Sequence, residues 1–190
     1  MESKNIMIVG VGGQGTLLAS KLLGRILLEN GYDVKVSEVH GMSQRGGSVV
    51  TYVRCGDKVY SPIIDKGEAD IVLSFELLEA ARWAEYLKEG GLLLTNTQKI
   101  NPMPVITGAA EYPEDLEQKL AALPIRLDAI DALGPALAAG SAKAVNLVLL
   151  GRLSRYFDFT DAQWQDAIEK SVPAKFLELN KTAFARGAEG

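Results

Sequence analysis

A glycine-rich motif near the amino end could bring the backbone close to a ligand or to another protein chain. Residues 10–15 have the sequence Gly-Val-Gly-Gly-Gln-Gly, which fits the pattern G-x-G-x-x-G. Glycines permit close approach of the backbone, and a following helix offers free N–H groups and a partial positive charge to an anion. The candidate residues of this motif are Gly10, Gly12, Gly13, Gln14 and Gly15.

The glycine motif leaves two interpretations open. In the first it binds a dinucleotide, and Glu38, about 20 residues further on, accepts the ribose hydroxyls. In the second the glycines only permit a tight crossing from strand to helix and close packing of that helix on the sheet. The motif alone does not separate these interpretations.

A second candidate block is the stretch VHGMSQRGGSVV at residues 39–50, which contains the only histidine of the chain. His40 could act as a general acid or base, because an unperturbed imidazole has a pKa of about 6.5, or it could simply hold the loop by hydrogen bonds. Arg45 could clamp a phosphate or carboxylate beside backbone N–H groups, or it could be a solvated loop arginine. The candidate residues are His40, Ser43, Gln44, Arg45, Gly46 and Gly47.

The composition narrows the classes of function. One cysteine, Cys55, supplies neither an all-cysteine metal site nor an iron–sulfur cluster, and its place in a strand indicates an inert core thiol. No second histidine and no Ser-His-Asp set accompany His40, so we expect no catalytic residue that acts by itself. The net charge of −4 provides no positive field for nucleic acid. No apolar run approaches the roughly 20 residues of a membrane span, so we expect a cytoplasmic protein without membrane or nucleic-acid partners.

The elements around the two blocks follow a strand, helix, strand order. Residues 6–11 predict a buried strand, residues 17–28 a helix ended by Asn30-Gly31, and residues 34–39 a second strand parallel to the first. Residues 49–54 and 58–61 predict an inserted hairpin around a Gly56-Asp57 turn. Both candidate blocks therefore fall at the carboxyl ends of strands, where open α/β sheets bind ligands.

The rest of the chain continues this alternation of strands and helices and is then predicted to be helical. Further predicted strands are 69–75, 92–95 and 125–128, and predicted helices are 76–88, 114–123, 131–139, 142–157, 161–171 and 174–186. The predicted fold class is α/β: a doubly wound, mostly parallel, Rossmann-like sheet with an inserted hairpin and a C-terminal helical segment. We expect one domain, 1–190, with the helical part 131–190 packed on it.

Four stretches carry a resemblance to a known family. They are GVGGQGTLLASKLL (10–23), SEVHGMSQRGGSVVTYVR (37–54), VYSPII (59–64) and ADIVLSFELLEAAR (69–82). They closely resemble the gamma subunits, or gamma-type domains, of the 2-oxoacid:ferredoxin oxidoreductases, a family that includes pyruvate ferredoxin oxidoreductases. Within that family the likeness is greatest to the small subunits of the indolepyruvate enzymes.

The resemblance implies a subunit that completes a catalytic assembly. The family couples oxidative decarboxylation of a 2-oxoacid, with coenzyme A, to reduction of ferredoxin. Thiamine diphosphate, Mg and iron–sulfur clusters are held largely by other subunits, so this chain is expected to hold no cofactor. The expected partners are the larger thiamine and iron–sulfur subunits, with ferredoxin reached through the complex. The residues of both blocks would face a ligand or the partner.

Three hypotheses therefore follow for the function of the chain. The leading one is an accessory subunit of a thiamine-dependent 2-oxoacid oxidoreductase, inactive alone. The alternative is a free-standing Rossmann-type dinucleotide-binding oxidoreductase that uses Glu38, and a third is a regulatory domain for a small ligand or phosphate. The 2-oxoacid itself stays open among pyruvate, 2-oxoglutarate, branched-chain and aryl pyruvates. We also expect the isolated chain to self-associate, with a homodimer as one possible form, because a surface meant for partners leaves apolar area exposed.

Overall fold

The fold is built on one six-stranded sheet with the strand order β2-β3-β1-β4-β5-β6. The computed structural model describes residues 2–40 and 47–190, and it describes His40 only as the last residue of its strand. The pairs β1–β4, β4–β5 and β5–β6 are parallel, whereas β3 is antiparallel to both of its neighbours. The strands are β1 (Lys4–Val11), β2 (Asp33–His40), β3 (Ser48–Gly56), β4 (Ala69–Ser74), β5 (Leu87–Asn96) and β6 (Arg126–Ile130).

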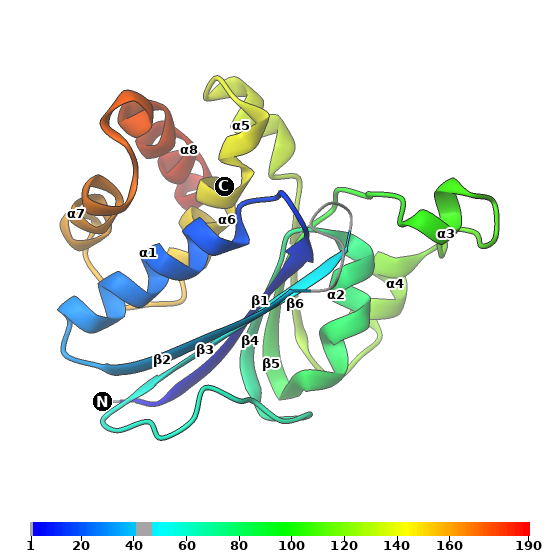
Figure 1. The fold of residues 1–190 in the computed structure, drawn as a ribbon, viewed down its shortest axis with the longest axis horizontal. Helices are drawn as coiled ribbons and strands as arrows, with labels where there is room; N and C mark the ends of the chain where they lie inside the picture. Colours follow the sequence, from blue (N-terminus) through cyan, green and yellow to red (C-terminus); the bar gives the residue numbers. More distant parts are fainter. Residues whose placement is uncertain (1, 41–46) are drawn as a thin grey trace.

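Helices cover both faces of this sheet (Figure 1). One face carries α1, α5, α6, α7 and α8, and the other carries α2 and α4. Among the described residues no helix is long and apolar enough to cross a membrane. The α-helices are α1 (Thr16–Glu29), α2 (Leu77–Trp83), α3 (Met103–Ile106), α4 (Leu116–Ala121), α5 (Leu133–Ala138), α6 (Val145–Ser154), α7 (Asp161–Ser171) and α8 (Leu177–Glu189); 3-10 turns span Ala84–Tyr86, Ala142–Ala144 and Ala174–Phe176.

The first strand shows how a continuous apolar run serves two cores. Successive side chains of a strand point to opposite faces of its sheet. Ile6 and Ile8 accordingly pack in the core beneath α1 and α6, whereas Met7 and Val9 pack in the core beneath α2 and α4. All four are fully buried. A strand covered on both faces must be apolar throughout, and this explains why it has no polar alternation.

The predicted fold class is confirmed, and one prediction about the strand pairing is wrong. Residues 58–61 are not a strand, because the N–H of Val59 donates to the carboxylate of Asp33 at 2.8 Å instead of to a neighbouring strand. The antiparallel insertion is made by β3 with β2. Strand β2 runs in the same direction as β1, as predicted, but β3 lies between them.

Several element boundaries also differ from the sequence prediction. The predicted helix 76–88 stops at Trp83, because Leu87 already pairs with Ala69 and opens β5. Helix α3 was not predicted. The end of α1 at Asn30-Gly31 is confirmed, and α7 begins as expected at Asp161, where Thr160 and Gln163 form a reciprocal capping box.

The C-terminal helices are fastened to the sheet by an ion pair. Arg152 of α6 donates to Asp128 of β6 at 2.8 and 3.1 Å, and the Tyr156 hydroxyl donates to the same carboxylate at 2.7 Å. Burial alone would raise the pKa of Asp128, but the hydrogen bonds from Arg152 and Tyr156 outweigh it and hold that pKa below its usual value. The charged form of Asp128 is therefore favoured by folding.

We expect Asp128→Asn to lower the free energy of unfolding by about 2 kcal/mol at neutral pH, since charge-assisted hydrogen bonds lose their charged acceptor. The lowered pKa makes this contribution complete above the unfolded-state value of about 3.9 and lost as the pH falls through the lower folded-state value. Urea unfolding from pH 7 to pH 3 measures it. A gap between wild type and variant that stays constant down to pH 3 would contradict this assignment.

Candidate functional site

The candidate site lies at the edge of the sheet where the parallel strands end. The glycine loop, residues 10–15, follows β1 there, and α2 begins there after β4. Because β3 is antiparallel to β1, its first residue Ser48 lies at the same edge, where Val11 pairs with it. The last residue of β2, His40, lies at this edge as well. The structure therefore places the described ends of the second block, His40 and residues 47–50, at the same edge as the glycine loop.

Gln14 fixes the shape of the glycine loop. Its side-chain oxygen accepts the N–H of Val11 at 2.8 Å, and its side-chain nitrogen donates to the carbonyl of Phe75 at 3.0 Å. A Cβ on Gly10 would lie 2.9 Å from that Gln14 oxygen and 3.0 Å from the Cβ of Phe75. The amide thus ties the loop to the end of β4, and the side chains of Gln14 and Phe75 leave no room for a side chain at position 10.

Gly15 is held against the C-terminal helical part. Its φ of 86° lies in the left-handed region that side chains disfavour, and a Cβ would lie 2.6 Å from Nδ2 of Asn146. The Asn146 amide donates to the carbonyl of Gly15 at 3.4 Å and accepts the N–H of Leu147 at 2.9 Å. These contacts agree with the close-packing interpretation of the glycines at Gly10 and Gly15. At Gly13, in contrast, a Cβ would meet no described atom within 4 Å, so this glycine faces open space.

One backbone bond joins the glycine loop to the second block. The N–H of Gly12 donates to the carbonyl of Gly47 at 2.9 Å. The hydroxyl of the next residue, Ser48, donates to the carboxylate of Glu79. The other candidates of that block, Ser43, Gln44, Arg45 and Gly46, lie outside the described residues.

Two buried carboxylates stand at the start of α2. Glu76 caps the helix by accepting the N–H of Glu79 at 2.9 Å, and its other oxygen accepts the N–H of Ile100 at 3.0 Å and the hydroxyl of Tyr112 at 2.6 Å. Burial and the Glu76 hydrogen bond raise the pKa of Tyr112. Glu79 accepts from Ser48, from Arg82 at 3.1 Å and from the Trp83 indole at 3.3 Å. All four oxygens of these two carboxylates accept hydrogen bonds, so both side chains hold the neighbouring segments in place.

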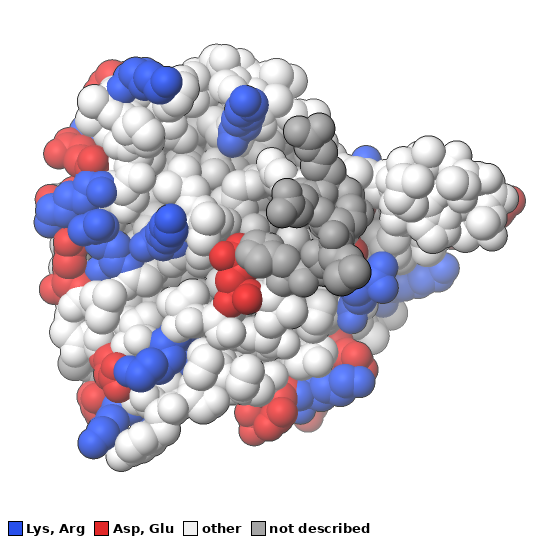
Figure 2. All heavy atoms as spheres, viewed as in Figure 1, with Lys and Arg blue, Asp and Glu red and all other residues white. Residues whose placement is uncertain are grey.

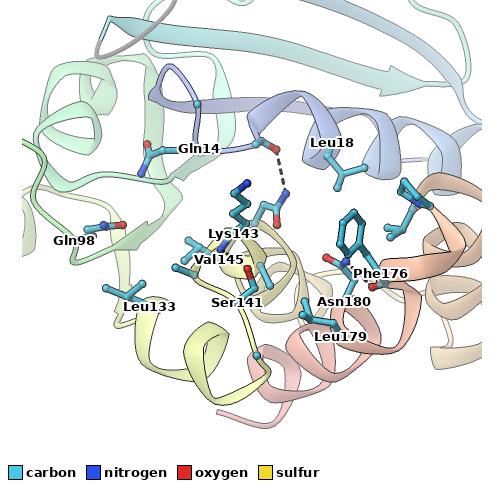
Figure 3. A pocket seen from close by; sticks show the side chains of 18 of the residues that line it. Gln14, Leu18, Gln98, Leu133, Ser141, Lys143, Val145, Phe176, Leu179 and Asn180 are labelled. Carbon is cyan, nitrogen blue, oxygen red and sulfur yellow. Dashed lines mark hydrogen bonds between the residues drawn. The ribbon is translucent and has the colours of Figure 1, made fainter.

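A cavity of about 670 Å³ opens beside the glycine loop (Figure 3). Its polar lining includes Gln14 and Lys143, and none of the ion pairs between described residues involves Lys143. In Figure 3 the Lys143 side chain points toward the loop that carries Gln14. The apolar lining consists of Leu18, Ile100, Leu133, Ala142, Ala144, Val145, Val172, Pro173, Phe176 and Leu179. This cavity suits a ligand with an apolar stem and an anionic group.

The position of Glu38 disfavours the dinucleotide interpretation. Glu38 pairs with Thr51 of β3, and Thr51 pairs with Ile8 of β1. It is thus two strand spacings, roughly 9 to 10 Å, from the strand that carries the glycine loop. The dinucleotide arrangement has the acidic residue on the strand next to the loop. The inserted strand β3 occupies that place here.

Sequence reasoning missed Glu76, Glu79, Lys143 and Asn146. Signals for two of them were present: Glu76 directly follows a buried strand, and Asn146 interrupts an apolar helix. Nothing in the sequence indicates that Ile100 and Tyr112 meet Glu76, or that Asn146 meets Gly15. These partners come from segments far apart in the chain.

The described residues do not fit the redox cofactors of the resembled family. They contain no group of three or more His, Cys, Asp or Glu side chains that could hold a metal ion. Cys55 is buried, as predicted, and its burial raises the pKa of the thiol. These residues therefore offer no ligand set for an iron–sulfur cluster or a magnesium ion.

Comparison with known proteins gives a consistent result. Residues 5–190 match the family model described as pyruvate ferredoxin/flavodoxin oxidoreductase. The chain is 45% identical to indolepyruvate oxidoreductase subunit IorB of Thermococcus kodakarensis, over 100% of this chain and 96% of that protein.

Two solved structures share the fold. Pyruvate oxidoreductase subunit PORC from Thermotoga maritima superimposes with a TM-score of 0.76 at 24% identity, covering 100% of this chain and 97% of that chain. A 2-oxoglutarate:ferredoxin oxidoreductase chain from Magnetococcus marinus, solved with 2-oxoglutarate, coenzyme A and succinyl-CoA, gives a TM-score of 0.77 at 18% identity. That match covers 100% of this chain and 31% of the larger one.

Proposed function

The chain belongs to the pyruvate ferredoxin/flavodoxin oxidoreductase family, and from this premise we propose that it is the small, non-cluster-binding subunit of a thiamine-diphosphate-dependent 2-oxoacid:ferredoxin oxidoreductase. The assembled enzyme decarboxylates a 2-oxoacid, transfers the acyl group to coenzyme A and passes the electrons to ferredoxin. In this proposal the whole chain, 1–190, acts as one cytoplasmic domain that docks on larger thiamine and iron–sulfur subunits.

The observation that carries this proposal is the end-to-end match to a subunit of an indolepyruvate oxidoreductase, which leaves 4% or less of either protein unmatched. The match also favours an aryl pyruvate as the 2-oxoacid of the assembly. The M. marinus chain supports the docking, because there a region of the same fold makes up 31% of one long oxidoreductase chain. In this proposal, regions that are fused in that long chain would be separate subunits in the assembly that contains this chain.

The carboxyl edge of the sheet is the proposed contact surface. The glycine loop and Gly47 present backbone there, and Ser43, Gln44, Arg45 and Gly46 would face the partner near the cofactor or the coenzyme A entrance. Arg45 would offer charge to a phosphate or carboxylate, while His40 and Gln44 would hold the loop by hydrogen bonds. The cavity beside Lys143 has the size and polarity to receive an apolar, phosphate-bearing part of coenzyme A.

Arg45→Ala separates two roles of this loop. If Arg45 contacts coenzyme A or the 2-oxoacid, the Michaelis constant of that compound should rise in an assembled complex whose turnover number is retained. If Arg45 only seals the interface, the complex should dissociate more readily, with normal kinetics for the fraction that remains assembled. Unchanged assembly together with unchanged kinetics would refute both roles.

Co-expression with the large subunit of the same organism tests the proposal. We expect a stable complex in analytical ultracentrifugation, and no calorimetric signal when NAD, NADH or FAD is added to the isolated chain. Micromolar binding of one of these dinucleotides, without a complex, would instead support the free-standing oxidoreductase. Failure of the two chains to associate would refute the accessory-subunit proposal.

A further inference from the structure

An uncharged arm projects from the body of the molecule between β5 and α4. We define the arm as residues 100–110, which contain α3 and not one Asp, Glu, Lys, Arg or His. Figure 1 shows it extending away from the sheet, and in Figure 2 its surface is almost entirely white, in contrast to the charged rim of the body. Met103 and Ile106 are 60% and 65% exposed.

The arm has a regular, hydrogen-bonded backbone although none of its residues is buried. The N–H groups of Ala109 and Ala110 both donate to the carbonyl of Pro104, at 2.8 and 3.0 Å, and the N–H of Thr107 donates to the carbonyl of Met103 at 2.9 Å. A single helical turn is not stable by itself in water, and ordering each residue costs about 1–2 kcal/mol. The body covers Ile100, Pro102 and Val105 only in part and leaves the other arm residues exposed, so packing within this chain offsets only part of this cost.

The first residue of the arm and Tyr112, two residues beyond its last, are both fixed to one buried side chain. The N–H of Ile100 and the hydroxyl of Tyr112 both donate to Oε1 of Glu76. Glu76 also caps α2 through Glu79, whose carboxylate accepts the hydroxyl of Ser48. The base of the arm is thus connected, through the first turn of α2, to Ser48 of the second sequence block.

We propose that the arm inserts Met103 and Ile106 into an uncharged, apolar cleft of the larger oxidoreductase subunit. This inference rests on the proposed function, and the connection through Glu76 and Glu79 makes the arm continuous with the edge that docks there. The absence of charge from residues 100–110 requires an uncharged receptor, because burying an unpaired charge opposite the arm would be costly. Specific complexes bury about 800 Å² per partner, so the arm and the sheet edge together form the contact.

The test measures binding of the thiamine-bearing large subunit to immobilised chain by biolayer interferometry. The variant Met103→Asp with Ile106→Asp should weaken binding by at least about tenfold, since two buried apolar side chains become charged. Met103→Ala with Ile106→Ala should weaken it less but in the same direction. The matched control is Ile63→Asp, an apolar side chain on the loop at the opposite edge of the sheet, half exposed at 50%. It should leave the affinity within about twofold of wild type, as surface changes outside an interface do.

Each outcome has a distinct meaning. Both arm substitutions lie on exposed side chains, so the thermal midpoint should match that of wild type. If wild type binds the large subunit and the Asp variant binds equally well, the arm proposal is overturned while the proposed function stands. If the variant loses only self-association of the isolated chain, the arm contacts a second copy and this proposal is wrong. If wild type fails to bind the large subunit at all, the proposed function itself fails.

Discussion

Gly151→Ala is expected to lower the free energy of unfolding by about 3 kcal/mol, because the added methyl group overpacks a backbone contact that cannot relax by rotamer change. Gly151 lies in the buried helix α6, and a Cβ there would overlap the carbonyl oxygen of Phe184 in α8. The reverse contact exists at Gly187 of α8, where a Cβ would overlap the carbonyl oxygen of Val148. Helices α6 and α8 can pack this closely only because Gly151 and Gly187 carry no side chain.

The matched control is Gly24→Ala in α1. A Cβ at Gly24 would meet only Cγ2 of Val36, at the ordinary contact distance of 3.8 Å. Alanine in a helix interior is favoured over glycine by roughly 0.5–1 kcal/mol, so this change should raise stability. Urea unfolding measures the free energy of unfolding of both variants. The same substitution should lower it at Gly151 and raise it at Gly24. Equal stability of Gly151→Ala and wild type would contradict the close helix contact.

The second large effect is expected at Gly15, where the loop meets the helical part. Gly15→Ala should lower the free energy of unfolding by about 2–4 kcal/mol, the sum of a left-handed backbone cost and a steric clash with Asn146. Because the displaced loop also carries Gly12 and its bond to Gly47, we expect at least about tenfold weaker binding to the large subunit. Calorimetric unfolding and interferometry measure the two effects.

Two further variants assign the Gly15 effect to its causes. Gly13→Ala places a methyl group in open space at a φ of 99°, so it should cost only the backbone strain of about 1–2 kcal/mol. Asn146→Ser introduced together with Gly15→Ala should recover part of the lost binding, because the shorter side chain makes room. Equal losses at Gly13 and Gly15, without recovery by Asn146→Ser, would show that the clash has no role.

The sequence predicted those parts of the fold that depend on local patterns. The continuous apolar run of β1, the Asn30-Gly31 end of α1 and the start of α7 are each encoded within a few neighbouring residues, and they are confirmed. The hairpin prediction failed because strand pairing is a long-range choice. Residues 58–61 alternate like a strand, but Asp33, on another strand, accepts the Val59 N–H.

The candidate site was predictable only in part, for the same reason. The glycine motif predicts a tight crossing from strand to helix. In the structure, the contacts at Gly10 and Gly15 leave no room for a side chain. The partners in those contacts are remote in sequence: Phe75 for Gly10 and Asn146 for Gly15. Likewise, the role of Glu76 depends on Ile100 and Tyr112, which lie 24 and 36 residues further along the chain. The family resemblance, by contrast, depends on the order of residues along the chain and on no tertiary contact. It is confirmed by the match over residues 5–190.

The most direct test of the central claim is reconstitution of activity from separate chains. Ferredoxin reduction is followed with coenzyme A and either indolepyruvate or pyruvate, using the large subunit alone, this chain alone, and the two mixed. We expect no turnover by this chain alone and coenzyme A-dependent turnover of a 2-oxoacid by the mixture, well above that of the large subunit alone. Equal turnover by the large subunit with and without this chain would contradict the claim that the chain completes the catalytic assembly.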